Sequence, residues 1–354
     1  MEKNIFVDLK ENSYNIFIKK GLLNNIGEEI KKIYKGKKIF IITDENVNKY
    51  YGEIVVKSLN DAGYSTRKLA LEPGEETKSF DTLPKIYKEL LDFKLTRKEL
   101  IITLGGGVIG DLGGFAASTF LRGVPFIQVP TSLLAQVDSS VGGKVAVDLP
   151  EGKNLVGSFY QPKAVFIDPE VLHTLSNKFY KDGMAEVIKY GCIKDKDFFY
   201  KLMSLKSRNE VMDNIEEIIY KCCDIKRQVV EMDEKDLGER MLLNFGHTLG
   251  HAIEKYYNFT TYSHGEAVGI GMYNISLKAE KDGITAKGTT EEIKKILINY
   301  DLPYEVDLED NSSVIETIAL DKKNIGNTLK VILLEEIGKS IIYNTTPDFF
   351  QEDN

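Results

Sequence analysis

The chain has 354 residues, enough for about two domains at roughly 150 residues each, so each domain can bury a core of its own. Its 46 lysines and arginines against 54 aspartates and glutamates leave a net charge of −8, which argues against sequence-independent nucleic-acid binding. With 42% hydrophobic and 28% charged residues, the composition is typical of a globular protein and excludes disordered and fibrous classes.

The three cysteines, Cys192, Cys222 and Cys223, are too few and too clustered for a disulfide framework, which favours a reducing compartment. Residues 1–8 interrupt their apolar side chains with charges and so lack the hydrophobic region of a secretory signal. No apolar run approaches the ~20 residues of a membrane span. We therefore expect a cytoplasmic protein without a membrane partner, whose cysteines only fill space.

The first half alternates short apolar runs with amphipathic stretches. Buried strands are predicted at residues 38–42, 99–104, 126–129 and 164–167. Helices are predicted at residues 46–62 and 82–93, between the first two strands. Such alternation indicates a parallel sheet with right-handed crossovers.

Beyond about residue 168 the pattern becomes mostly helical, with a long helix predicted at residues 214–232. We therefore place a domain boundary near residue 174, between an α/β domain at 1–174 and a mostly α-helical domain at 175–354. Residues 330–334 are either a late strand or a buried helical segment, and periodicity does not decide between them.

A glycine-rich run follows the predicted strand 99–104. Gly105, Gly107 and Gly110 fit the G-x-G-x-x-G spacing, which brings backbone N–H groups to a pyrophosphate at a helix N-terminus. The acidic residue that this pattern expects about 20 positions later is missing. The run indicates either a nucleotide site or a tight turn without a ligand. Asp44, after the strand 38–42, is a candidate ribose ligand and equally a candidate helix N-cap.

Three of the four histidines lie within 18 residues. His247 and His251 are four positions apart and would share one helix face, and His264 begins another helical stretch. Two imidazoles and one carboxylate compose a catalytic zinc site. Glu186 is the candidate carboxylate, because it stands on an apolar face where it needs a cation. A single histidine is more often structural, but the trio with Glu186 favours a metal; His173 is either structural or close to the nucleotide.

Five basic residues are flanked by glycine or apolar residues: Arg122, Lys144, Lys153, Lys189 and Arg240. Scattered lysines are usually solvated. Lys144 and Lys153, however, lie in glycine-rich loops whose backbone can close on phosphate or carboxylate oxygens. An acidic protein with such loops favours a small, multiply anionic substrate.

Long ordered motifs between about residues 40 and 325 resemble the 3-dehydroquinate synthase family. They are GGGVIGDL at 105–112, QVPTSLLAQVDSSVGGK at 128–144, GMAEVIKYG at 183–191, NFGH at 244–247 and HGEA at 264–267. The resemblance implies a Rossmann-like nucleotide domain, a helical metal-binding domain, a homodimer, and one active site in the cleft between the domains. The ligands it implies are NAD⁺, a divalent metal (zinc, with cobalt as an alternative) and the sugar phosphate 3-deoxy-D-arabino-heptulosonate 7-phosphate.

Matching these motifs residue by residue implies three kinds of site. Glu186, His247 and His264 take the metal-ligand positions. The nucleotide positions are Asp44, Glu75, Glu76, Lys78, Gly107, Val108, Ile109, Gly110, Asp111, Thr131, Ser132, Leu172, His173 and Thr174, with Lys144 and Lys153. Substrate positions are Arg122, Lys153, Asn154, Lys189 and Lys226, and the catalytic ones are Asp138, Lys144, Arg240, Asn244 and His251. Lys226 and the turn with Lys322 and Lys323 match less closely.

The implied reaction oxidises a ring hydroxyl with NAD⁺, eliminates phosphate, reduces the ketone again, opens the ring and closes it by an aldol step. A metal would lower the pKa of the hydroxyl that is oxidised, and Arg122, Lys144 and Lys153 would neutralise the carboxylate and phosphate. The substrate's own phosphate is available as the base. Ser132 stands where many relatives repeat threonine, and it keeps the hydroxyl.

Three alternatives remain. Other sugar phosphate cyclases would share the fold, NAD and metal ligands but act on other sugars, whereas Arg240 with Asn244 suits a substrate carboxylate. A metal-dependent polyol dehydrogenase would produce net NADH. A catalytically silent nucleotide-binding regulator is disfavoured by the complete metal set.

Overall fold

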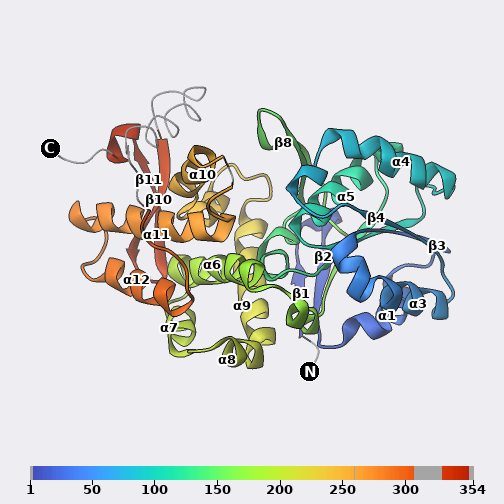
Figure 1. Cartoon of the computed structure of the whole chain (residues 1–354), viewed down its shortest axis with the longest axis horizontal. Helices are drawn as coiled ribbons and strands as arrows, with labels where there is room; N and C mark the ends of the chain where they lie inside the picture. Colours follow the sequence, from blue (N-terminus) through green and yellow to red (C-terminus); the bar gives the residue numbers. More distant parts are fainter. Residues whose placement is uncertain (1–2, 259, 307–328, 351–354) are drawn as a thin grey trace. The chain divides into compact units, whose positions relative to one another are not determined.

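The computed structural model describes residues 3–258, 260–306 and 329–350, which form two packing units (Figure 1). Unit 1 comprises Met1–Leu175 with Ile215–Lys235, and unit 2 comprises Ser176–Asn214 with Asp236–Asn354. Lys322 and Lys323 lie outside the described residues. Among the helices described, none is both long enough and apolar enough to cross a membrane.

Unit 1 is built on a seven-stranded sheet with the order β1-β2-β9-β6-β5-β3-β4. The β1–β2 pair is antiparallel and the other neighbours are parallel. Its strands are β1 (Lys3–Val7), β2 (Tyr14–Ile18), β3 (Lys38–Asp44), β4 (Ser65–Leu71), β5 (Leu100–Gly105), β6 (Phe126–Pro130) and β9 (Ala164–Ile167). The predicted parallel α/β architecture is thereby confirmed, with the four predicted strands as β3, β5, β6 and β9.

Helices cover both faces of this sheet. Successive side chains of β3 point to opposite faces and pack against different helices. Ile39 and Ile41 pack in the core formed with α1 (Ile26–Ile33) and α3 (Glu53–Asp61). Phe40 and Ile42 pack in the core formed with α4 (Leu83–Asp92) and α5 (Gly107–Thr119). A strand buried on both faces is apolar at every position, which is why these strands stand out in the sequence.

The predicted helix 46–62 is interrupted in the structure. It consists of α2 (Glu45–Val47), a π-helical turn (Asn48–Gly52) and α3. The predicted helix 82–93 corresponds to α4. Unit 1 also contains a separate antiparallel hairpin, β7 (Lys144–Leu149) and β8 (Gly152–Phe159), which was not predicted.

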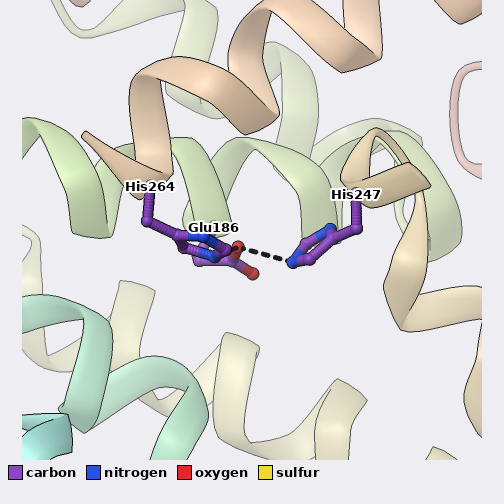
Figure 2. Close-up of side chains that lie close together, drawn as sticks. All are labelled: Glu186, His247 and His264. Carbon is purple, nitrogen blue, oxygen red and sulfur yellow. Dashed lines mark ion pairs between the residues drawn. The ribbon is translucent and has the colours of Figure 1, made fainter. Parts of the chain in front are cut away.

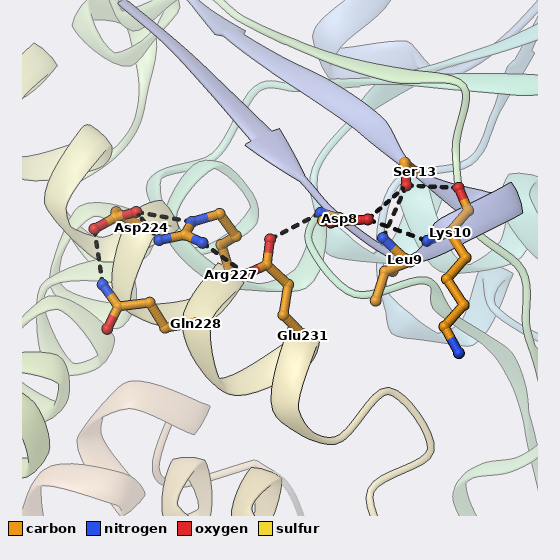
Figure 3. A network of polar contacts seen from close by, with 8 residues as sticks. All are labelled: Asp8, Leu9, Lys10, Ser13, Asp224, Arg227, Gln228 and Glu231. Carbon is orange, nitrogen blue, oxygen red and sulfur yellow. Dashed lines mark hydrogen bonds and ion pairs between the residues drawn. The ribbon is translucent and has the colours of Figure 1, made fainter.

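The predicted helix 214–232 is α9 (Ile215–Met232), and it packs with unit 1 although the sequence prediction assigned it to the second domain. Polar contacts explain this correction (Figure 3). Glu231 on α9 accepts a hydrogen bond of 2.8 Å from the backbone N–H of Asp8, just after β1. Arg227 orients Glu231 through an ion pair of 2.6 Å, and Cys223 on the same helix donates to the Gln136 carbonyl.

The described part of unit 2 is mostly helical, as predicted, and it also contains a small hairpin. The helices are α6 (Asn177–Lys194), α7 (Lys196–Ser204), α8 (Arg208–Asp213), α10 (His247–Tyr256), α11 (His264–Lys281) and α12 (Thr289–Asn299). The hairpin pairs β10 (Leu329–Glu336) with β11 (Lys339–Thr345) in antiparallel register. Residues 330–334 are therefore a strand.

Glycines set the close approach of the central helices in unit 2. A Cβ on Gly271 of α11 would collide with the carbonyl oxygen of Gly246, just before α10. A Cβ on Gly265 would collide with the backbone of Asp182 in α6. These contacts bring the first turns of α10 and α11 against their neighbours, so a side chain at either glycine requires a backbone shift.

We expect the substitution Gly271→Ala to lower the free energy of unfolding by about 1–3 kcal/mol, because the added methyl overpacks a backbone contact. Urea titration followed by circular dichroism measures this. Ser276→Ala is the matched control on α11, because its buried hydroxyl has no hydrogen-bond partner among the described residues and its removal is close to neutral. Equal stability of G271A and the parent chain would contradict the packing described.

Candidate functional site

Glu186 is a buried charge on α6, with 1% of its surface exposed. Neither carboxylate oxygen accepts a hydrogen bond of normal geometry from the described residues. The carboxylate is balanced by cationic neighbours, the closest being the ammonium of Lys189, one helical turn later, with which it forms an ion pair. Burial raises the pKa of this carboxyl, but Lys189 and His247 outweigh burial and hold it well below its usual range.

Two imidazoles lie on either side of this carboxylate (Figure 2). The Nε2 atom of His247 is 3.4 Å from Glu186 Oε1, and that of His264 is 3.7 Å from the same oxygen. Burial and Lys189 lower the pKa of His247. Burial also lowers the pKa of His264, but the nearby carboxylates of Glu186 and Glu254 raise it to about 10. A metal bound here would have to displace that proton.

Each of these histidines is the first residue of its helix. Gly246, with φ +78°, turns the chain into α10 at His247. Ser263 and Glu266 form a capping box at the start of α11, so that His264 follows a fixed helix end. Asp182 of α6 strengthens this end, since its Oδ1 accepts a hydrogen bond of 3.0 Å from the Gly265 N–H.

A second group of potential ligand atoms overlaps the first. The side chains of His251, Glu254 and His264 also offer ligand atoms within 4.8 Å of one another, as do those of Glu186, His247 and His264. Glu254 is 4% exposed, and its Oε2 is 3.2 Å from Nδ1 of His264. Sequence reasoning missed Glu254. Its signal was a carboxylate seven positions after His247, on the same face of α10.

The first group has the composition of a zinc site. Two imidazole nitrogens and one carboxylate oxygen, with room for a further ligand, make a catalytic zinc set. A cation would also neutralise the carboxylate oxygens that lack hydrogen bonds. Glu186, His247 and His264 could therefore hold a divalent metal.

The nucleotide candidates of unit 1 follow three adjacent parallel strands, whose carboxyl ends meet at one edge of the sheet. Asp44 ends β3, Gly107 opens α5 directly after β5, and Thr131 follows β6. Asp44 Oδ1 accepts a hydrogen bond of 3.0 Å from the Val47 N–H, so it caps α2, as one of its two sequence interpretations required. Burial raises the pKa of Asp44.

The glycine run lies close to the segment after β6. A Cβ on Gly106 would stand 3.4 Å from Oγ of Ser132, and one on Gly107 would stand 3.2 Å from Oγ of Ser139. No side chain caps the N-terminus of α5, which begins within this run at Gly107. The arrangement is a half-buried helix start without Cβ atoms in its way, which suits a phosphate.

Lys78 lies close to three carboxylates, two of which belong to other nucleotide candidates. It is 4% exposed, and its Nζ lies 3.0 Å from Asp111, 3.4 Å from Glu75 and 4.0 Å from Asp148. Burial lowers the pKa of Lys78, but Asp111 and Glu75 outweigh burial and raise it, so the lysine stays charged. Asp148, on β7, was not predicted from the sequence. Lys78 therefore ties the turn at Glu75–Thr77 to the first turns of α5.

The remaining nucleotide candidates differ in exposure. Thr131 and Leu172 are buried, whereas Glu76 and His173 are exposed. The Thr174 hydroxyl lies 2.7 Å from the Tyr51 hydroxyl, and Val108, Ile109 and Gly110 form the first turn of α5.

Six substrate and catalytic candidates lie in unit 1. Lys226 of α9 is buried against Asp138, with its Nζ 3.0 Å from Oδ1 and donating to the backbone carbonyl at 2.7 Å. The less certain sequence match at Lys226 thus contacts a predicted catalytic carboxylate. Lys144, Lys153 and Asn154 belong to the β7–β8 hairpin and are exposed. Arg122 is also exposed and has a positive φ of 67°.

The other substrate candidates lie in unit 2. Lys189 and Arg240 are buried, each 2% exposed. Asn244 and His251 are exposed. The ring of His251 packs near both candidate metal imidazoles, with centroids 5.4 Å from His247 and 5.9 Å from His264.

We expect Lys78→Met to lower the free energy of unfolding by about 3 kcal/mol, because it leaves the Asp111 carboxylate without its buried partner. The double substitution K78M/D111N should recover part of this loss, since the unpaired charge is then gone. Urea unfolding of the parent chain and both variants tests this. A double variant no more stable than K78M would contradict the ion pair's role.

Comparison with known proteins agrees with the geometry. Residues 68–182 match the family described as 3-dehydroquinate synthase N-terminal, and residues 183–324 match 3-dehydroquinate synthase C-terminal. The chain is 70% identical to the 3-dehydroquinate synthase of Clostridium botulinum strain Alaska E43, covering 99% of this chain and 100% of that protein. It is 68% identical to that of Clostridium beijerinckii, covering 98% and 99%.

Among solved structures, the chain is similar to 2-deoxy-scyllo-inosose synthase complexed with carbaglucose-6-phosphate, NAD⁺ and Co²⁺. The TM-score is 0.86 at 25% identity, and the match covers 99% of this chain and 98% of the other. The two family matches and the extent of identity to the clostridial enzymes agree with the resemblance seen in the sequence motifs. The chain belongs to the 3-dehydroquinate synthase family.

Proposed function

We propose that the chain converts 3-deoxy-D-arabino-heptulosonate 7-phosphate to 3-dehydroquinate and phosphate, with NAD⁺ and a divalent metal as cofactors. Full-length identity to clostridial 3-dehydroquinate synthases supports the substrate. The observation that carries the proposal is the buried Glu186 carboxylate, which lacks hydrogen bonds and lies beside two imidazoles. One carboxylate oxygen and two imidazole nitrogens within reach of one another are a donor set typical of zinc.

Glu186, His247 and His264 would hold the metal, and zinc fits this donor set best, with cobalt as the alternative. When bound, NAD⁺ accepts and returns a hydride while the metal lowers the pKa of the hydroxyl being oxidised. Lys189 contributes a fixed positive charge next to Glu186. His251 lies exposed beside these imidazoles and is proposed to handle a substrate proton.

In unit 1, the edge formed by Asp44, the glycine run and Thr131 is proposed to bind NAD⁺. The glycine run would allow backbone N–H groups to reach the pyrophosphate, and Ser132 adds a hydroxyl beside Gly106. Because the reaction has no net redox, these residues must retain the nucleotide through both hydride steps. Lys78 keeps the adjoining turn in place through Asp111 and Glu75.

Substrate charges would be met by the basic residues. Arg122, Lys144 and Lys153 are proposed to neutralise the phosphate and carboxylate, and Arg240 with Asn244 suits the carboxylate. Lys226 fixes the orientation of Asp138 through two contacts. We also propose that the chain acts as a homodimer, which the family resemblance supports. A cytoplasmic location is supported by three buried cysteines that form no disulfide.

We expect the purified chain to release phosphate from 3-deoxy-D-arabino-heptulosonate 7-phosphate when NAD⁺ is present at a small fraction of the substrate concentration. Absorbance at the NADH maximum should stay flat, because the hydride returns to substrate in each turnover. Steady accumulation of NADH would instead indicate a polyol dehydrogenase. Phosphate release from glucose 6-phosphate would indicate another sugar phosphate cyclase.

We further expect a chelator to abolish turnover and Zn²⁺ to restore it. His264→Ala should lower kcat by at least about 100-fold, because a Lewis acid contributes several kcal/mol to such a transition state. Lys281→Ala, an exposed change at the end of the same helix, is the control and should keep the parent activity. Turnover that is indifferent to chelation, or an H264A variant with the parent rate, would remove the metal from the proposal.

A further inference from the structure

A buried carboxylate next to the candidate metal ligands has no role in the function proposed above. Glu254 lies on α10, is 4% exposed, and contacts His264 on the following helix. A buried carboxylate is costly unless it is paired. The Nδ1 atom of His264, 3.2 Å away, is a partner for its Oε2 oxygen.

The two candidate imidazoles are held in the same way. Nδ1 of His247 is 3.1 Å from the carbonyl oxygen of Phe245, and Nδ1 of His264 is 3.2 Å from Glu254. An oxygen at this distance accepts a hydrogen bond from Nδ1–H, which leaves Nε2 as the nitrogen that can coordinate a metal. In both residues Nε2 is the atom that faces Glu186. Both rings therefore present Nε2 to the same carboxylate oxygen.

The backbone of His264 is fixed independently of its ring. The capping box of Ser263 and Glu266 and the hydrogen bond from Gly265 to Asp182 set the start of α11. They leave the rotation of the imidazole undetermined. Glu254 contacts the ring at Nδ1, on the side away from Nε2.

The overlapping group of His251, Glu254 and His264 offers a second interpretation, in which Glu254 is itself a metal ligand. The geometry favours the first group. Glu254 already accepts from His264 Nδ1, and His251 is exposed, whereas Glu186 is buried with both oxygens lacking hydrogen bonds.

We propose that Glu254 is a positioning residue for the metal site: it holds His264 with Nδ1 protonated and Nε2 turned toward Glu186. The inference rests on the proposed metal site and adds a residue to it. Carboxylates that hold a ligating histidine in this way typically change metal affinity by about 10–100-fold when they are removed.

The test measures Zn²⁺ affinity of the full chain by competition with a chromophoric chelator, for the parent and for the variants E254Q and E254L. We expect E254L to bind Zn²⁺ about 10–100-fold more weakly. E254Q should lose less Zn²⁺ affinity than E254L, because its amide oxygen can still accept a hydrogen bond from Nδ1–H of His264. Lys255→Ala, an exposed neighbour on α10, is the matched control and should bind as the parent does.

A second readout is the visible d–d spectrum of the Co²⁺-loaded chain, which reports ligand geometry. It should change in E254L and return toward the parent spectrum in E254Q. Thermal unfolding of the metal-free variants separates the two roles, since a purely structural contact would lower the unfolding temperature and leave Zn²⁺ affinity unchanged. E254Q keeps the shape of the side chain, so it tests the proposal even if E254L does not fold.

Three outcomes would overturn the proposal. If H264A loses Zn²⁺ affinity while both Glu254 variants bind as the parent does, only the positioning role fails. If H264A itself binds Zn²⁺ normally, the proposed metal site fails with it. If His251→Ala loses affinity together with the Glu254 variants and His247→Ala does not, Glu254 is a ligand of the second group.

Discussion

The burial of the Glu186 carboxylate is the constraint on which the arrangement of unit 2 depends. A charge with 1% of its surface exposed is tolerated only among cations, and α6 by itself supplies one of them, Lys189. The other partners come from helices that begin at His247 and His264. Because each imidazole is carried by the first residue of its helix, the site is only as well defined as those two helix ends. The capping box and the glycine contacts at Gly265 and Gly271 define them.

The strands of the fold that could be predicted from the sequence are those buried on both faces. β3, β5, β6 and β9 are mostly apolar and buried at nearly every position, whereas β2 alternates buried with half-buried positions and β4 is half-buried along most of its length. The packing partner of α9 could not be predicted, because an amphipathic stripe indicates that a helix is buried without indicating against what. The contact from Glu231 to Asp8 spans 223 positions of sequence and has no local signal.

The same distinction applies to the candidate site. The spacing of His247 and His251 and the apolar surroundings of Glu186 are local patterns, and they were enough to name the candidate ligands. Glu254 and Asp148 are single carboxylates whose roles depend on contacts with residues in other elements, His264 and Lys78. The sequence also left two interpretations of Asp44, and the hydrogen bond from Val47 favours the cap.

The two units handle buried charge in opposite ways, and this separates residues that support a site from residues that bind a ligand. Lys78 in unit 1 faces Asp111, Glu75 and Asp148, so internal carboxylates already satisfy its charge. Such a lysine holds the turn against α5. Glu186 in unit 2 pairs with Lys189 through Oε2, while its Oε1 faces the Nε2 atoms of two imidazoles and accepts no hydrogen bond from the described residues. A buried group satisfied by its own protein acts as support, and one that is not is the place where a ligand gains binding energy.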